Sequence, residues 1–179
     1  MEELNNKPNL LSPILKQTDC ASCKFCCSFR RQSLWETPIF DSDTKQKLQE
    51  LFPDARFRPA GRSGKSWSFD ISQNYKTSDP NEEAVCPFLN SQNGCALPPE
   101  LKPLDCKIWP LRVVCLPDTK KSVIALTPTC PAINKVPPQK IIELLKSGLG
   151  QKILEYADSH PDIIKDYSSF LSNIVYNEG

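Results

Sequence analysis

The sequence CASCKFCC, residues 20–27, places four cysteines within eight positions: Cys20, Cys23, Cys26 and Cys27. Gaps of two residues let a tight loop turn several sulfur atoms toward one point. Thiolates that lie so close repel one another unless a cation neutralises them. The stretch therefore predicts a metal site that organises the chain around it.

Two kinds of metal site fit this spacing. Zinc takes four ligands tetrahedrally, often from two Cys-x-x-Cys pairs. Iron–sulfur clusters also take four thiolates, and in bacterial ferredoxins a C-x2-C-x2-C run is followed by a distant Cys-Pro. This chain has two distant Cys-Pro pairs, Cys86-Pro87 and Cys130-Pro131. The pattern favours an iron–sulfur cluster, of the 4Fe–4S type, and leaves zinc as the alternative cofactor.

The adjacent pair Cys26-Cys27 adds a constraint. Neighbouring side chains on an extended backbone point to opposite faces, so a single metal rarely collects both. One of the two then serves a second metal, another atom of a larger cluster, or the core. Buried free thiols and structural disulfides are the alternatives that need no metal.

Composition sets the class of protein. The chain has 179 residues, of which 39% are hydrophobic and 24% charged, as in a globular protein able to bury a core without disulfides. The net charge of +1 excludes a strong overall field for nucleic acid or anionic lipid. Nine is an odd number, so the cysteines cannot all form disulfides with one another. No secretory signal and no membrane span is visible, so we expect a cytoplasmic protein in which thiols persist as thiols or metal ligands.

The order of motifs predicts three segments: a flexible N-terminal segment (1–17), a cysteine-cluster metal-binding domain (18–136) and a helical C-terminal extension packed on it (137–179). Within the domain, capping residues before an apolar edge predict a helix over 41–52. Residues 56–65 read as a basic loop, and 67–71 alternate as in a half-buried strand. Prolines exclude a long helix from 87 to 110.

The later part of the chain predicts a hairpin followed by helices. Residues 112–116 and 122–126 are β-prone and are joined by a short turn. The tail is helical from Pro138, with a stop at Ser147-Gly148. Beyond Pro161, apolar residues recur at helical spacing. They are Ile163, Tyr167, Phe170, Leu171 and Ile174. The fold class expected is α+β: a small, irregular, loop-rich, metal-bound domain with short strands and a helical C-terminal tail.

The motifs together resemble a known family. Beyond residues 20–27 they are Cys86-Pro-Phe-Leu, Gly94-Cys95, Pro103-x2-Cys106-x2-Trp109-Pro and Cys130-Pro. Their order resembles the CxxCxxCC cysteine-cluster family, described as zinc- or iron-chelating, over about residues 20–131. Lys102-Pro103 stands where the family has Arg-Pro, and lysine lacks the planar fork of arginine. The cluster also occurs in flagellin lysine methylase, which this chain resembles in no other feature.

The resemblance implies a set of metal ligands and leaves the activity undefined. The implied ligands are Cys20, Cys23, Cys26, Cys27, Cys86, Cys95, Cys106 and Cys130. Cys115 matches no motif and is expected to be a core thiol. The roles that fit are electron transfer, metal handling or scaffolding. A structural zinc module that binds a protein or nucleic acid, and a cluster-dependent enzyme related to the lysine methylases, are the alternatives.

Three other features carry weaker signals. Gly61-Arg-Ser-Gly64-Lys-Ser fails as a phosphate loop because Pro59 stands where the first glycine is needed. Arg56, Arg58, Arg62 and Lys65, with Arg30 and Arg31, form a basic set that could contact single-stranded nucleic acid or be a solvated loop. His160, the one histidine, precedes a proline, and a helix-end role fits it better than catalysis.

Overall fold

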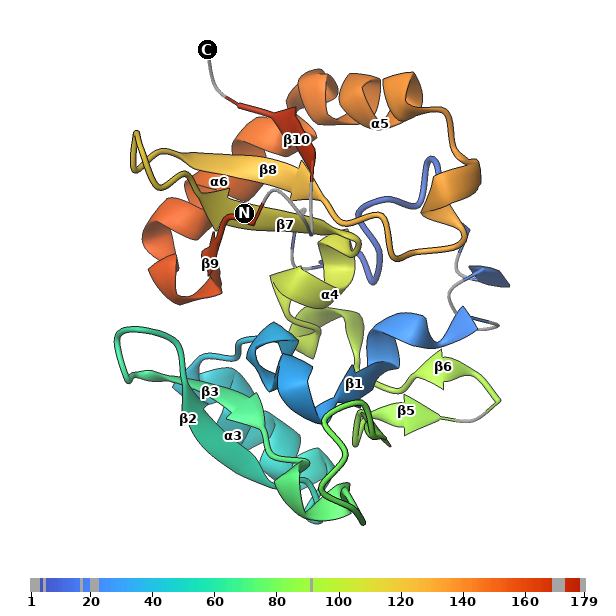
Figure 1. The fold of residues 1–179 in the computed structure, drawn as a ribbon, viewed down its shortest axis with the longest axis vertical. Helices are drawn as coiled ribbons and strands as arrows, with labels where there is room; N and C mark the ends of the chain where they lie inside the picture. Colours follow the sequence, from blue (N-terminus) through green and yellow to red (C-terminus); the bar gives the residue numbers. More distant parts are fainter. Residues whose placement is uncertain are drawn as a thin grey trace.

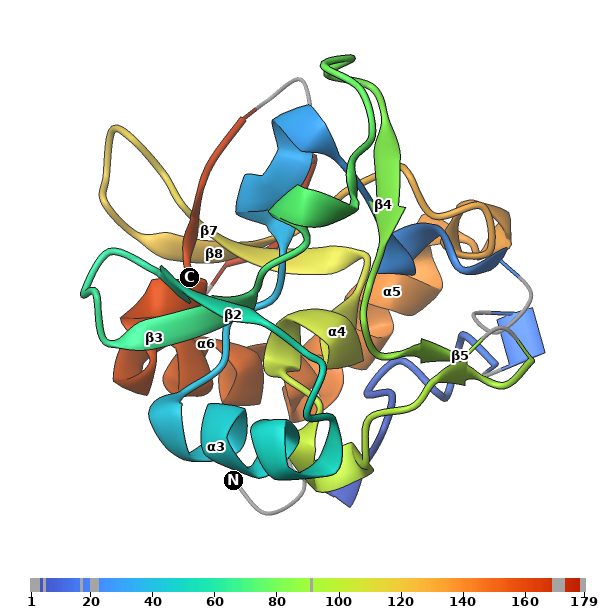
Figure 2. The same cartoon turned by 90° about the horizontal axis from the view of Figure 1, so that it is seen from below.

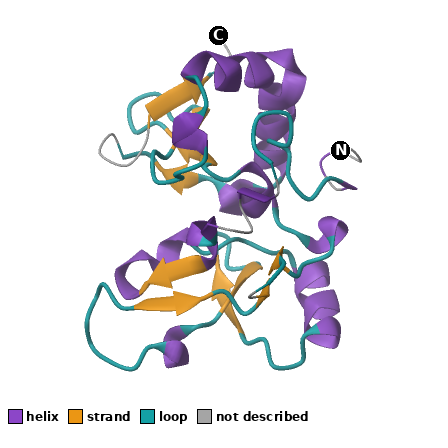
Figure 3. Cartoon of the chain, turned by 90° about the vertical axis from the view of Figure 1, so that its right-hand side faces the viewer, coloured by secondary structure: helices purple, strands orange, loops and turns teal. Residues whose placement is uncertain are grey.

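The elements fall into two parts (Figures 1 and 3), each built around a large hydrophobic cluster, and Val114, Val123 and Ala125 form a third, small one in the described part of the chain. The computed structural model describes residues 4, 6–16, 18–19, 23–90, 92–168 and 173–177. We call one cluster aromatic, since it is built around Phe29, Phe40, Phe69 and Phe88. The other large cluster, which we call aliphatic, is built around leucine and isoleucine side chains such as Leu111, Ile124 and Ile153.

The helix expected over 41–52 is confirmed as α3 (Ser42–Leu51). The Asp41 carboxylate caps it by accepting a hydrogen bond from the Thr44 amide at 2.7 Å. Leu48 is fully buried in the aromatic cluster. Figure 2 shows α3 below the hairpin of β2 (Phe57–Ala60) and β3 (Ser66–Phe69).

The β2–β3 hairpin corrects one expectation. The strand at 67–71 is confirmed over Ser66–Phe69, whereas the basic loop expected over 56–65 is wrong for its first half. Phe57 pairs with Phe69 and Ala60 with Ser66, so β2 occupies part of that stretch. Hydrogen bonding to the partner strand and burial of the aromatic side chains stabilise β2 as a strand, although this stretch contains charged residues. The loop proper runs from Gly61 to Lys65.

Short elements surround the aromatic cluster. Phe88 lies at its centre, with ring centroids 5.2 Å from Phe52 and 6.0 Å from Phe69. The remaining elements of this half are η1 (Phe25–Cys27), β1 (Ser28–Arg30), η2 (Arg31–Glu36), η3 (Ser72–Asn74), β4 (Glu83–Val85), β5 (Leu89–Asn90), β6 (Gly94–Cys95) and η4 (Pro99–Leu101). Strand β1 pairs with β4, and β5 with β6, each antiparallel.

A four-stranded sheet in the order β10-β8-β7-β9 carries the aliphatic half. The predicted hairpin is confirmed as β7 (Leu111–Cys115) and β8 (Ser122–Leu126), with Val113 opposite Ile124. The short α4 (Leu104–Ile108) precedes it, in line with the prediction that no long helix spans 87–110. Beyond the hairpin, η5 (Ile133–Lys135) leads to the helices.

The C-terminal extension is helical only in its first half. The helices are α5 (Pro138–Leu144) and α6 (Gly150–Ser159), joined by η6 (Leu145–Leu149). Gly148 has a non-helical φ of 105°, so the chain kinks at the predicted stop. Beyond the short η7 (Pro161–Ile163), the predicted helix is wrong. Residues Lys165–Asp166 form β9 and Asn173–Tyr176 form β10, which pair with β7 and β8. Open strand edges offer backbone partners that helical spacing does not reveal; Phe170 and Leu171 lie outside the described residues.

The N-terminal segment, predicted to be flexible, contributes buried side chains. Leu10, Leu11 and Leu15 are buried in the aliphatic cluster, and the Leu10 amide donates to the Lys107 carbonyl at 3.0 Å. Within the described ranges, no helix is long and apolar enough to cross a membrane. The fold is thus mixed α/β and loop-rich with small sheets and a C-terminal helix, which confirms the expected class at that coarser level.

Candidate functional site

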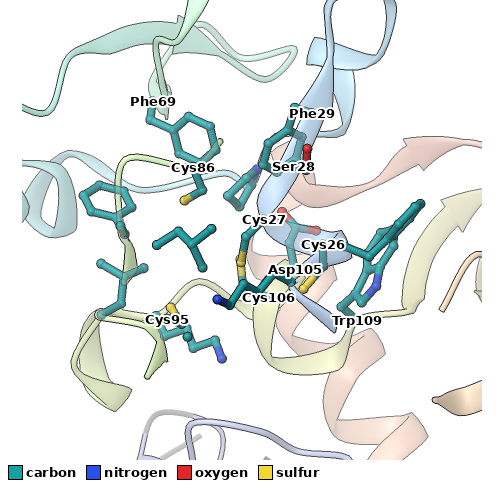
Figure 4. A pocket seen from close by; sticks show the side chains of 18 of the residues that line it. Cys26, Cys27, Ser28, Phe29, Phe69, Cys86, Cys95, Asp105, Cys106 and Trp109 are labelled. Atoms are coloured by element: carbon teal, nitrogen blue, oxygen red, sulfur yellow. The ribbon is translucent and has the colours of Figure 1, made fainter. Parts of the chain in front are cut away.

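One cavity of about 120 Å³ gathers five cysteines (Figure 4). Their side chains come from four separate parts of the chain: Cys26 and Cys27 from η1, Cys86 after β4, Cys95 from β6 and Cys106 from α4. The rest of the lining is mainly apolar and includes Phe25, Phe29, Phe40, Phe69, Phe88 and Trp109. Cys26 and Cys27 of the early motif and three of the later cysteines therefore meet in space, across 80 residues of sequence between Cys26 and Cys106.

Backbone pairing fixes the first three sulfurs. Lys24 adopts a left-handed conformation with φ of 53°, which starts the tight turn η1. The Cys86 amide then donates to the Cys27 carbonyl at 2.8 Å, beside the β1–β4 pair in which Ser28 lies opposite Val85. Strand pairing therefore brings Cys86 next to the early motif.

Two further turns bring in the other two cysteines. In the β5–β6 hairpin, Leu89 lies opposite Cys95, and the Leu89 amide donates to the Cys86 carbonyl at 3.1 Å. Gly94 has a φ of 83°, so the tight turn before Cys95 needs a residue without a side chain. Pro103 starts α4, where the Cys106 amide donates to the Pro103 carbonyl at 3.0 Å.

The pKa values of three of these thiols, Cys26, Cys86 and Cys106, are raised, which favours their protonated form in the absence of a cation. Burial raises the pKa of Cys106 well above its usual range, and the nearby Lys102 offsets only part of this. It also raises the pKa of Cys86 to about 12. For Cys26, a hydrogen bond with Cys27 and then burial raise the pKa far above its ordinary value. A metal cation at this cavity would have to displace those protons.

The three other cysteines that the structure describes lie elsewhere. Cys130 is buried in the aliphatic cluster, where its Sγ accepts a hydrogen bond from the Ile133 amide at 3.5 Å. Cys23 is exposed and is not among the residues that line the cavity, and Cys20 lies outside the described residues. Cys115 ends β7, with its Sγ 3.7 Å from the Leu116 carbonyl.

The sulfurs are gathered but not in a coordinating geometry. In the described part of the chain, no group of three or more histidine, cysteine, aspartate or glutamate side chains is arranged to hold a metal ion. The chemistry of the donors nevertheless suits soft metals, because five thiols face one mainly apolar cavity.

Local sequence patterns did not indicate two polar residues that line the same cavity, Glu36 and Arg112. The Arg112 Nη2 donates to the Glu36 Oε2 at 3.2 Å, although the two are 76 residues apart. Asp105, next to Cys106, also lines the cavity. Its Oδ2 accepts a hydrogen bond from the Ile39 amide at 3.1 Å, so it also fixes the chain before α3.

Residues of the basic stretch over 56–65 make contacts with other parts of the molecule. Arg58 donates to the Leu34 carbonyl at 2.8 Å, and Arg62 pairs with Asp166. The Ser63 amide donates to Asp162 at 2.8 Å. These contacts favour a structural role over nucleic-acid binding.

His160 occupies the C-terminal end of α6, as its position before a proline suggested. Its Nδ1 lies 3.0 Å from the Tyr156 carbonyl, and its ring stacks on that of Tyr156 at 4.0 Å.

No family model, no curated protein and no solved structure matches this chain. The resemblance to the CxxCxxCC family stays a prediction, and the function has to be argued from the cavity itself.

Proposed function

We propose that this protein binds a metal centre through cysteine thiolates at the cavity lined by side chains of the aromatic cluster. The observation that supports it is the gathering of Cys26, Cys27, Cys86, Cys95 and Cys106 along one cavity. Free thiols are often buried for packing alone. Packing gives no reason, however, for hairpins and turns from four parts of the chain to direct five of them to one place.

An iron–sulfur cluster is the centre we favour, with zinc as the alternative. Both take four thiolates, so five cavity cysteines exceed the need of one centre. Of the adjacent pair, one cysteine then ligates and the other packs or holds a second iron. A cluster would supply one-electron chemistry and zinc would supply a structural crosslink; the roles we propose are electron transfer, metal handling or scaffolding for a protein partner.

Metal binding here should depend on pH. The thiols of Cys86 and Cys106 have raised pKa values because they are buried, so protons and metal compete for the sulfurs. Loading should release protons and weaken as the pH falls.

Anaerobic purification with elemental analysis, acid-labile sulfide measurement and an absorption spectrum tests the proposal. We expect iron and sulfide in equal amounts with a broad visible band, or stoichiometric zinc without colour if the alternative holds. Cys106→Ser should lower the metal content sharply, whereas Cys115→Ser is the matched control and should leave it intact. Wild-type protein without metal, or equal losses in both variants, would refute the proposal.

A further inference from the structure

A second cavity, of about 430 Å³, borders the segment 35–40, which also borders the cysteine cavity. The odd-numbered residues of this segment, Trp35, Thr37 and Ile39, line the second cavity, and its even-numbered residues line the first. Because successive residues alternate between the two, the segment forms a wall between them. No described residue lines both cavities, so a ligand in the second would not compete with a metal in the first.

Two cationic side chains from different halves of the molecule meet at this second cavity. Arg58, on β2, donates from Nη2 to the Leu34 carbonyl at 2.8 Å and to the Thr37 hydroxyl at 3.0 Å. Lys165, on β9, donates from Nζ to the Trp35 carbonyl at 3.3 Å. Leu34 and Trp35 are consecutive, so the guanidinium and the ammonium lie close together at the end of η2.

The charges of this pair are not balanced by carboxylates. The cavity is lined by three cationic side chains and two carboxylates, so its formal charge is positive by one. Both carboxylates are engaged elsewhere, since Asp162 accepts hydrogen bonds from two serines and Asp166 pairs with Arg62. Within the described part of the chain, neither Arg58 nor Lys165 forms an ion pair with a carboxylate.

Both cations keep donors that an anion could use. An arginine side chain carries five N–H groups and a lysine ammonium three. Arg58 has no nitrogen that is both buried and unpaired, so its Nε and Nη1 remain accessible. Burial lowers the pKa of Lys165, and an anion beside the ammonium would stabilise its charged form. A phosphate monoester suits two cations because it carries about 1.5–2 negative charges and three acceptor oxygens.

The same cavity offers an apolar surface for a flat ring. Trp35 is 48% exposed and lines the cavity together with Tyr167, Ile39 and Ile164. Exposed aromatic side chains stack on flat ligands. Since an engineered cavity of about 150 Å³ holds benzene, a cavity of about 430 Å³ has room for roughly 17 heavy atoms, enough for a ring and a phosphate.

We propose that this second cavity binds a small aromatic phosphate monoester. The phosphate lies between Arg58 and Lys165, and the ring lies against Trp35. The site goes beyond the proposed function, because it uses none of the cysteines and does not depend on a bound metal.

Titration calorimetry of wild-type protein with 1-naphthyl phosphate, 1-naphthol and inorganic phosphate tests the inference. The ester should bind at least about tenfold more tightly than either of its parts, because only the ester makes both the charge-assisted hydrogen bonds and the ring contact. Adenosine monophosphate and O-phosphotyrosine, titrated in the same way, distinguish a nucleotide from a phosphorylated phenol as the source of this chemistry.

Two variants separate the phosphate contact from the ring contact. Lys165→Met keeps the apolar stem but removes the ammonium, so it should weaken binding of the ester at least about tenfold. Trp35→Leu should weaken binding of the ester and leave that of inorganic phosphate unchanged, and it keeps the test decisive if Lys165→Met fails to fold.

Arg56→Gln is the matched control for the loss of a charge. Arg56 lies two residues from Arg58 but contacts Gln73 and Asn74 and does not line the cavity. Its substitution should change the affinity for the ester by less than about twofold, because exposed charges are screened. The inference is overturned if inorganic phosphate or 1-naphthol binds wild-type protein as tightly as the ester, or if Arg56→Gln and Lys165→Met lose affinity equally.

Discussion

Substituting Gly61 should cost far more stability than substituting Gly64 in the same loop. Both glycines have positive φ, 78° and 69°. A Cβ added at Gly64 meets nothing within 4 Å, whereas a Cβ at Gly61 would lie 2.4 Å from the Asp162 Cγ and 2.6 Å from its Cβ. The Cβ of Asp162 cannot rotate away, so the backbone of η7 must shift.

That shift would break the contact between the β2–β3 loop and η7. Asp162 accepts hydrogen bonds from the Ser63 amide at 2.8 Å, from the Ser66 hydroxyl at 2.6 Å, and from the Ser63 hydroxyl. Burial alone would raise the pKa of Asp162, but these donors lower it overall, as expected for a carboxylate held in its charged form.

The magnitudes follow from these contacts. Placing alanine in the left-handed region lowers the free energy of unfolding by about 1–2 kcal/mol. Part of this loss is offset because alanine also restricts the unfolded chain. Gly64→Ala should therefore lower the free energy of unfolding by about 1 kcal/mol. Hydrogen bonds to charged groups contribute about 1.5–3 kcal/mol when buried, and partial exposure places these near about 1 each. With the same left-handed strain and the loss of two of the three hydrogen bonds, Gly61→Ala should cost about 3 kcal/mol, or roughly 6–12 °C in Tm.

Urea unfolding of both variants, alone and in an Asp162→Gly background, measures the difference. Without the Asp162 side chain, Gly61→Ala should cost no more than Gly64→Ala, which gives a coupling of about 2 kcal/mol. If the two glycine variants lose equal stability in the wild-type background, the loop and η7 are not joined as described.

Three further outcomes are expected. Phe88→Ala should lower the free energy of unfolding by about 3–5 kcal/mol, measured by urea titration, because the ring is fully buried. Leu51→Ala, which truncates an exposed side chain, should lower it by under about 1 kcal/mol. Hydrogen bonds, first from the Lys76 amide, lower the pKa of Glu82 to about 2. The Glu82 carboxylate should therefore stabilise the fold fully above the ordinary carboxyl pKa, and this stabilisation should be lost as the pH falls through about 2. Glu82→Gln should remove that part of the pH dependence of unfolding. Cys130→Ala should leave the metal content of purified protein unchanged, because that side chain belongs to the aliphatic cluster.

Local signals predicted the elements that depend on neighbouring residues. Asp41 marked the start of α3, and the β-prone runs on either side of a turn marked the β7–β8 hairpin. The residues after His160 carry the same apolar spacing as a helix, yet they form strands because β7 and β8 present free edges. Such partners are distant in sequence, so no local pattern could report them.

The candidate site also contains features that sequence patterns indicate and features that depend on contacts distant in sequence. The motif order indicated that cysteines such as Cys86 and Cys106 meet the early cysteines, and both line one cavity with Cys26 and Cys27. The same spacing gave no reason to separate Cys130, which its neighbours bury elsewhere. The pairing of Arg112 with Glu36 was equally invisible, because it depends on how η2 packs against β7.

Helix α4 explains why a metal at this cavity would affect the whole chain. Leu104 and Ile108 are four residues apart, so they share one helix face, and both are buried in the aliphatic cluster. Cys106 is two residues from each, about 200° around the helix, and lines the cavity together with side chains of the aromatic cluster. A bond from a metal to the Cys106 Sγ would therefore tie both clusters together through a five-residue helix that is too short to be stable alone. Metal loading should accordingly make the two halves unfold as one unit.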